Sequence, residues 1–128
     1  MKAYRASLLR FADDGSALYE PDAFLLIGPG PGGVRRVRAA GAWSALSANY
    51  PGVSVEHLPG KLLAPGFIDL HVHFPQTDVI GSPADGLLPW LENYTFPHEA
   101  RFADHGDALG VADVFPDELP RNGVTSAP

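Results

Sequence analysis

The sequence lacks cysteine altogether and has few positively charged residues. With no cysteine in 128 residues, disulfide bonds and thiolate metal sites are both excluded. Lys and Arg number 9 against 15 Asp and Glu, a formal net charge of −6, which argues against nucleic-acid binding. No apolar run approaches the ~20 residues of a membrane span. The first ten residues carry charges and no long apolar core, so they make a poor signal peptide. We therefore expect a cytoplasmic protein without membrane or nucleic-acid partners.

Glycine and proline, in contrast, are abundant. The chain has 14 Gly and 13 Pro, well above average usage, which predicts many turns and short elements. Its hydrophobic content of 45% is ordinary for a globular protein and does not support wholesale disorder. Length alone suggests one domain.

The first 60 residues are typical of a β-rich region. Residues 4–11 and 53–58 alternate in polarity, which favours strands. The apolar run 23–27 predicts a buried strand, and 34–39 is expected to be its hairpin partner. A short helix is expected over 43–50.

A glycine-rich segment at 28–33 formally satisfies Gly-x-Gly-x-x-Gly, the dinucleotide-binding fingerprint. That fingerprint requires a helix that begins at the glycines and offers its backbone amides to a pyrophosphate. Pro29 and Pro31 each remove one such amide donor. The segment therefore favours a hairpin loop over a nucleotide site.

The strongest chemical signal is a pair of histidines, His71 and His73, at the end of an apolar run. Residues i and i+2 of a strand point to one face, so a strand here would place both imidazoles and Asp69 side by side. Neutral imidazole suits zinc, and two histidines supply half of a tetrahedral site. On the opposite face we expect apolar side chains that pack against covering helices, namely Ile68, Leu70 and Val72.

Residues 63–73, Leu-Ala-Pro-Gly-Phe-Ile-Asp-Leu-His-Val-His, resemble the first barrel strand of the amidohydrolase superfamily, whose metal lies on such a His-x-His pair. Four further segments resemble the guanine deaminases within that superfamily: 74–78, 81–82, 88–97 and 99–102. The resemblance covers roughly residues 60–126.

This resemblance implies an α/β fold with a β-rich N-terminus. Residues 1–61 would form the N-terminal part of a composite β-sandwich, and 62–128 the first one to two βα units of a TIM-like (β/α)8 barrel. Such a barrel needs ~250 residues. The barrel would therefore be incomplete, and we expect the chain to be an N-terminal fragment of a longer enzyme.

The resemblance also implies a zinc-dependent hydrolase that deaminates guanine to xanthine and ammonia. His71 and His73 would be metal ligands, and Gln76 would contact the purine. Asp69 is expected to support the site through hydrogen bonds. The family takes its other ligands and its proton-shuttling Glu from later strands, so the fragment holds no catalytic residue and should be inactive alone. The intact parent would be a homodimer. Whether the metal is zinc or iron stays open.

Beyond His73 the expected elements are a loop over 75–86, a short helix over 87–94 and a longer helix over 98–115. The residues expected to point inward from the longer helix are Phe102, Leu109, Ala112 and Phe115. Pro116 and Pro120 interrupt the positions where this helix would continue. A helix stop at 122–123 and a second strand over 124–127 follow. Glu99 and Arg101 are expected to form a solvated ion pair, and His57, His98 and His105 to be surface or capping residues.

Two other interpretations remain open. One is a fragment of a different amidohydrolase, acting on another cyclic amide or amine. Amidohydrolases that cleave dihydroorotate tend to place an Arg shortly after the histidine pair, where this chain has 74–76, Phe-Pro-Gln. The other is a non-catalytic β-rich module in which the histidine pair is incidental.

Overall fold

The computed structural model describes residues 1–128, and the chain forms two compact units, Met1–Pro65 and Gly66–Pro128. The first unit is built on a β-sheet, and the second is mainly helical with two short strands. A mixed α/β fold with a β-rich N-terminus was the expectation from sequence, and it is confirmed at that level.

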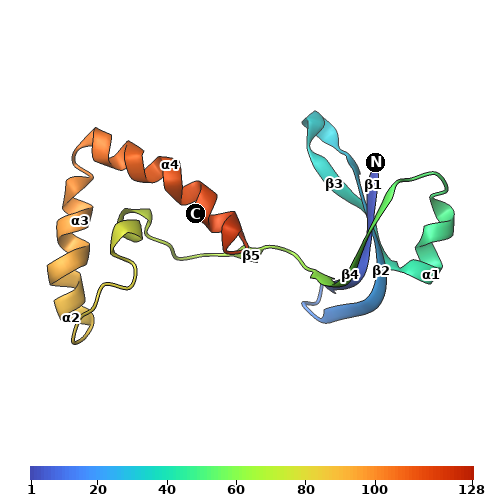
Figure 1. The fold of residues 1–128 in the computed structure, drawn as a ribbon, viewed down its shortest axis with the longest axis horizontal. Coiled ribbons are helices and arrows are strands. Elements are labelled where there is room, and N and C mark those ends of the chain that lie inside the picture. The colour runs from blue at the N-terminus through green and yellow to red at the C-terminus, as the bar shows by residue number, and fades with distance from the viewer. The chain divides into compact units, whose positions relative to one another are not determined.

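The first unit contains one four-stranded sheet in the order β3-β2-β1-β4 (Figure 1). Strands β1 (Lys2–Phe11), β2 (Ala17–Pro29) and β3 (Arg35–Ala42) pair antiparallel in sequence, as a meander. Strand β4 (Val55–Leu63) returns beside β1 in parallel. Such a parallel return requires a crossover connection, which here includes α1 (Trp43–Leu46) and a 3-10 helix, Ser47–Asn49.

The core of this unit lies where the crossover covers one face of the sheet. Phe24 and Leu26 are almost fully buried, and they share that face because they alternate along β2. The ring of Phe24 stacks on Tyr50 at 5.3 Å and meets Trp43 at 5.8 Å between centroids. These side chains, with Ala3 of β1, form the hydrophobic core of the first unit.

The opposite face of the sheet carries an apolar hollow of about 350 Å³. Leu25, which alternates with Phe24 and Leu26 along β2, lines it together with Val37 and Ala40 of β3. Leu63 at the end of β4 closes one side.

The glycine-rich segment joins β2 to β3 as a hairpin connection, as expected. It contains a single 3-10 turn, Pro31–Gly33, in which Gly32 and Gly33 both have positive φ, 66° and 79°. A left-handed backbone of this kind favours glycine. No helix begins at these glycines, so the segment lacks the amide cradle of a nucleotide site.

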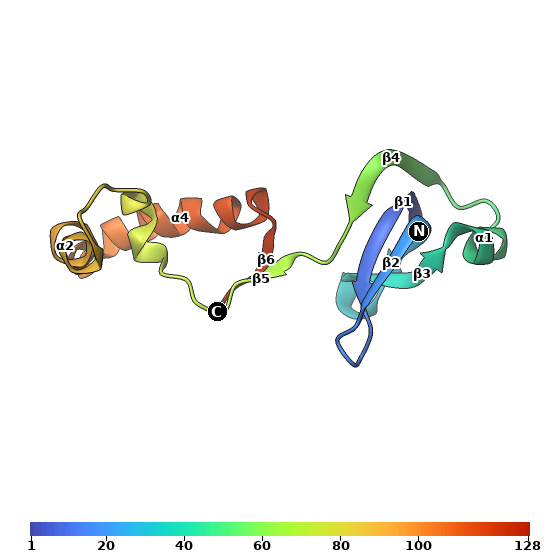
Figure 2. The same cartoon turned by 90° about the horizontal axis from the view of Figure 1, so that it is seen from below.

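In the second unit, β5 (Phe67–Ile68) pairs in parallel with β6 (Val124–Ser126). The connection between them contains a 3-10 helix, Phe74–Val79, where a loop was expected, followed by a succession of helices (Figure 2). None of these helices is both long enough and apolar enough to cross a bilayer.

The expected short helix over 87–94 is longer in the structure and continues to residue 101. It consists of α2 (Leu87–Trp90), a π-helical turn (Leu91–Thr95) and α3 (Phe96–Arg101). Pro97 explains the π turn, because a proline inside a helix lacks its N–H and clashes with the carbonyl four residues earlier. The wider turn before Pro97 accommodates that clash.

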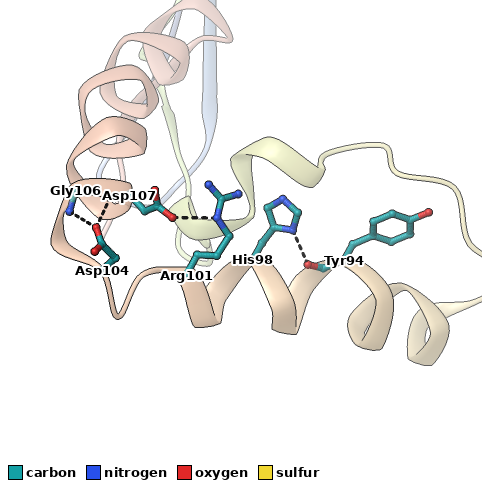
Figure 3. A network of polar contacts seen from close by, with 6 residues as sticks. All are labelled: Tyr94, His98, Arg101, Asp104, Gly106 and Asp107. Carbon is teal, nitrogen blue, oxygen red and sulfur yellow. Dashed lines mark hydrogen bonds and ion pairs between the residues drawn. The ribbon is translucent and has the colours of Figure 1, made fainter.

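The prediction of one helix over 98–115 is wrong. The helix α3 ends at Arg101, and α4 (His105–Arg121) begins after a break. Asp104 causes the new start, since its carboxylate accepts the N–H groups of Gly106 and Asp107, the usual role of an N-cap residue. Arg101 donates across the corner to Asp107 at 3.0 Å (Figure 3).

The helix α4 continues through Pro116 and Pro120 without interruption, although the sequence suggested that these prolines would end it. Each proline lacks an N–H and crowds the carbonyl four residues earlier, yet the helix continues, and the Asn122 N–H still reaches the carbonyls of Glu118 and Leu119. The expected stop at 122–123 is confirmed, with Gly123 at φ 82°.

Two of the four residues expected to point inward do so. Phe102 and Phe115 both pack against Phe74, with centroids at 5.3 and 6.1 Å. Leu109 and Ala112 are exposed. The prediction fails for these two because the partly buried positions of α4 are 107, 108, 111, 115, 118 and 119.

Candidate metal centre

The histidine pair follows β5 but does not lie on it, so the prediction of a long strand reaching His73 is wrong. Strand β5 ends at Ile68, and pairing with the short β6 extends only to the Asp69 N–H, which donates to the Ser126 carbonyl at 2.9 Å. Residues 70–73 have no strand partner on either side. The pairing partner, and not the apolar pattern, sets the length of this strand.

The apolar residues expected to be covered by helices are not all covered in this structure. Ile68 is 68% exposed and Leu70 is 84% exposed. Only Val72 is partly buried. The prediction that all three pack against helices is therefore wrong, since Ile68 and Leu70 remain open to solvent.

The two imidazoles nevertheless converge. The Nε2 atoms of His71 and His73 are 2.8 Å apart, and the ring centroids are 4.9 Å apart at 48°. Asp69 stabilises the bend before them, since its Oδ1 accepts the His71 backbone N–H at 3.0 Å. Asp69 makes this contact with the backbone of His71 and not with its imidazole, so the supporting role expected for Asp69 stays a prediction.

A hydrogen bond between two Nε2 atoms needs one protonated and one unprotonated nitrogen. A metal at the same point would instead need the lone pair of both Nε2 atoms. Neutral imidazole is a ligand type that suits zinc and iron. No third His, Asp or Glu joins them in a cluster that could hold a metal ion.

Gln76 lies beside this pair on the 3-10 helix Phe74–Val79. Its Nε2 donates to Glu99 Oε1 at 2.8 Å, a partly buried contact. The same Glu99 oxygen lies 3.8 Å from Nδ1 of His73. The three residues expected at the site are thus connected in series, from His71 to His73 to Glu99 to Gln76.

Glu99 is the residue that the sequence analysis missed. It was assigned to an ion pair with Arg101, and that prediction is wrong, because Arg101 bonds Asp107 (Figure 3). Gln76 and Glu99 are 23 positions apart. No local spacing could have identified their contact.

The remaining histidines take no part in this centre. His98 bonds the Tyr94 carbonyl at 2.9 Å within its own helix (Figure 3). His57 and His105 are exposed. His57 and His105 are surface residues as expected, whereas His98 is partly buried and does not cap a helix.

Comparison with known proteins relates the chain to guanine deaminases and, at 30% identity over 95% of its length, to a 5-methylthioadenosine/S-adenosylhomocysteine deaminase of Nitratidesulfovibrio vulgaris, although no protein-family model matches it. The chain is 37% identical to a guanine deaminase of Escherichia coli over 95% of its own length. It is also 37% identical, over 99% of its length, to a probable guanine deaminase of Deinococcus radiodurans. The chain spans 25% and 30% of the lengths of these two relatives.

A solved structure shows the same similarity in three dimensions. The guanine deaminase from C. acetobutylicum, crystallised with bound guanine in its active site, superposes with a TM-score of 0.77 at 28% identity. The match covers 98% of this chain and 29% of that one.

Proposed function

This chain belongs to the guanine deaminase family, and from that premise we propose that it supplies part of the active site of a guanine aminohydrolase. In this proposal the intact enzyme converts guanine and water to xanthine and ammonia. Its place would be in cytoplasmic purine breakdown, and it would act as a homodimer. Because the chain spans 25–30% of its relatives, it would contribute part of the site and have no deaminase activity by itself.

We assign each unit to one part of that enzyme. The sheet of residues 1–65 would be half of a composite β-sandwich, and the apolar hollow formed by Leu25, Val37 and Leu63 supports this, because an open apolar face favours a second layer. In residues 66–128, β5 and β6 are parallel and connected through helices. That is the pattern of a βα barrel unit.

In the active site, His71 and His73 would hold a zinc ion through Nε2, and Gln76 would orient the purine. A bound zinc ion lowers the pKa of water toward neutrality and so supplies a nucleophile for the ring carbon that bears the amine. The Gln76 amide offers an acceptor and two donors, and one donor is taken by Glu99. The remaining donor and the carbonyl are available to a base edge.

One observation carries this proposal: the convergence of the two Nε2 atoms at 2.8 Å. A test on the 128-residue chain is a zinc titration followed by imidazole ¹⁵N chemical shifts. We expect weak binding, with shifts confined to the Nε2 atoms of His71 and His73. Either His71→Ala or His73→Ala should abolish binding, and His105→Ala, which changes an exposed histidine of the same unit, should leave it unchanged.

A second test concerns the reaction. The longer protein that carries these residues should release ammonia from guanine, and His71→Ala or His73→Ala should reduce that release below detection. Turnover of dihydroorotate or another cyclic amide without turnover of guanine would instead identify a different amidohydrolase. No turnover of any of these substrates, together with no effect of added zinc on the stability of the unsubstituted protein, would indicate a non-catalytic module.

A further inference from the structure

We propose that Glu99 is a positioning residue that holds both the metal ligand His73 and the base-contacting Gln76. This inference rests on the proposed function for the roles of those two residues, and on the structure for their contacts. A single carboxylate oxygen, Oε1 of Glu99, accepts from Gln76 Nε2 at 2.8 Å and lies 3.8 Å from His73 Nδ1. It thereby connects the metal side of the site to the substrate side.

The contact with Gln76 determines which way the amide faces. A carboxylate only accepts hydrogen bonds, whereas a carboxamide has a donor side and an acceptor side. Turning the Gln76 amide by 180° would place its carbonyl oxygen against Glu99 and lose the bond. Glu99 therefore keeps the Gln76 carbonyl directed away from itself and available to an N–H of the base.

The Glu99 oxygen lies 3.8 Å from His73 Nδ1, beyond hydrogen-bond distance, so it acts on that nitrogen as a nearby negative charge. A carboxylate beside Nδ1 favours the proton on that nitrogen, and the lone pair then remains on Nε2. The observed 2.8 Å contact agrees with this arrangement if His71 Nε2 donates to His73 Nε2. A carboxylate behind the imidazole is the common support of a histidine that binds zinc.

Glu99 is available for this role because no cation neutralises it. Arg101, two positions along the same helix, is occupied by Asp107 at 3.0 Å. The Glu99 side chain is 35% exposed, so water screens its contacts only in part. The π turn and α3 bring it opposite the 3-10 helix that carries Gln76.

The experiment compares three variants of the 128-residue chain by NMR: Glu99→Ala, Glu99→Gln and the control Glu92→Gln. The control changes the net charge by the same amount as Glu99→Gln, and it replaces an exposed residue of the same helical run. Three signals are measured: the Gln76 Nε2–H resonances, the ring ¹⁵N pattern of His73 that distinguishes its tautomers, and the zinc affinity.

In Glu99→Ala we expect the Gln76 amide protons to move to the shifts of a solvated glutamine. His73 should lose its preference for the Nδ1–H tautomer, and the dissociation constant for zinc should rise about tenfold. Glu99→Gln should lose the tautomer preference in the same way, because its amide carries no charge. Glu92→Gln should leave all three signals unchanged, which separates local contacts from net charge.

An unchanged Gln76 amide and an unchanged His73 tautomer in Glu99→Ala would overturn the proposal. Equal effects of the Glu92 and Glu99 variants would overturn it as well. Failure of the unsubstituted chain to bind zinc would count against the proposed function alone, since the amide and tautomer signals test Glu99 without metal. The two hypotheses can therefore fail separately.

Discussion

Gly66, just before β5, lies against Thr125 of β6. Replacement of Gly66 by alanine tests whether this close contact stabilises the second unit. A Cβ atom built on Gly66 would lie 2.2 Å from both Cγ2 and Oγ1 of Thr125, and 2.7 Å from its Cβ. Non-bonded carbon atoms prefer about 3.5–4.0 Å, so the two segments would have to separate by about 1 Å. Two backbone bonds join the strands there: Phe67 N–H to Gly123 O at 2.8 Å, and Asp69 N–H to Ser126 O at 2.9 Å.

Two opposing effects determine the sign of the change. An alanine in place of glycine reduces the entropy of the unfolded chain and stabilises by about 0.4–1 kcal/mol where the space is open. Overpacking costs about 1–3 kcal/mol, and rotation of Thr125 cannot relieve the contact with its Cβ. We therefore expect Gly66→Ala to lower the free energy of unfolding of the second unit by about 1–2 kcal/mol.

Urea unfolding monitored by Trp90 fluorescence measures this change. The only other tryptophan is Trp43 in the first unit, and a Trp43→Phe background makes the signal specific to the second unit. The control Gly110→Ala in α4 has nothing within 4 Å of the added Cβ. It should stabilise by up to about 1 kcal/mol, the difference in helix propensity between the two residues.

A second substitution tests the cause. In a Gly66→Ala, Thr125→Gly double variant the crowding is removed, so its stability should exceed the sum of the two single effects by at least about 1 kcal/mol. Additive effects, or a Gly66→Ala variant as stable as the parent, would show that the contact between β5 and β6 is not made in solution.

Two further predictions concern the first unit. Phe24→Ala removes a ring that is 1% exposed and stacked on Tyr50. It should cost about 3–5 kcal/mol in a urea titration followed by Trp43 fluorescence, and a loss below 1 kcal/mol would place the core elsewhere. The hydrogen bond from Arg5 lowers the pKa of Asp22 below its ordinary value of 3.8. Its stabilising effect is therefore complete above that value and is lost as the pH falls through the lower folded-state pKa. Asp22→Asn should remove this part of the acid sensitivity in thermal unfolding at pH 2–5, and an unchanged pH profile would contradict it.

Much of the fold follows from local patterns. The alternation along 4–11 and the apolar run at 23–27 predicted β1 and the buried part of β2, because a sheet face is defined by every second side chain. The stop at 122–123 and the strand after it were also predicted correctly. The predictions were wrong where a contact with another segment sets the end of a strand or helix. Strand β5 ends early because β6 is short, and the break at 102–104 depends on the Asp104 cap.

The sequence by itself placed two imidazoles close together, since one residue separates them. The residues around this pair also indicated the family. The tertiary structure alone decided that Glu99 meets Gln76 and His73, because a contact across 23 positions depends on how a 3-10 helix packs against α3. Side-chain chemistry and the spacing of neighbouring residues can be determined directly from the sequence. Which residue a carboxylate contacts far along the chain depends on how the helix that carries it packs against the helix that carries its partner.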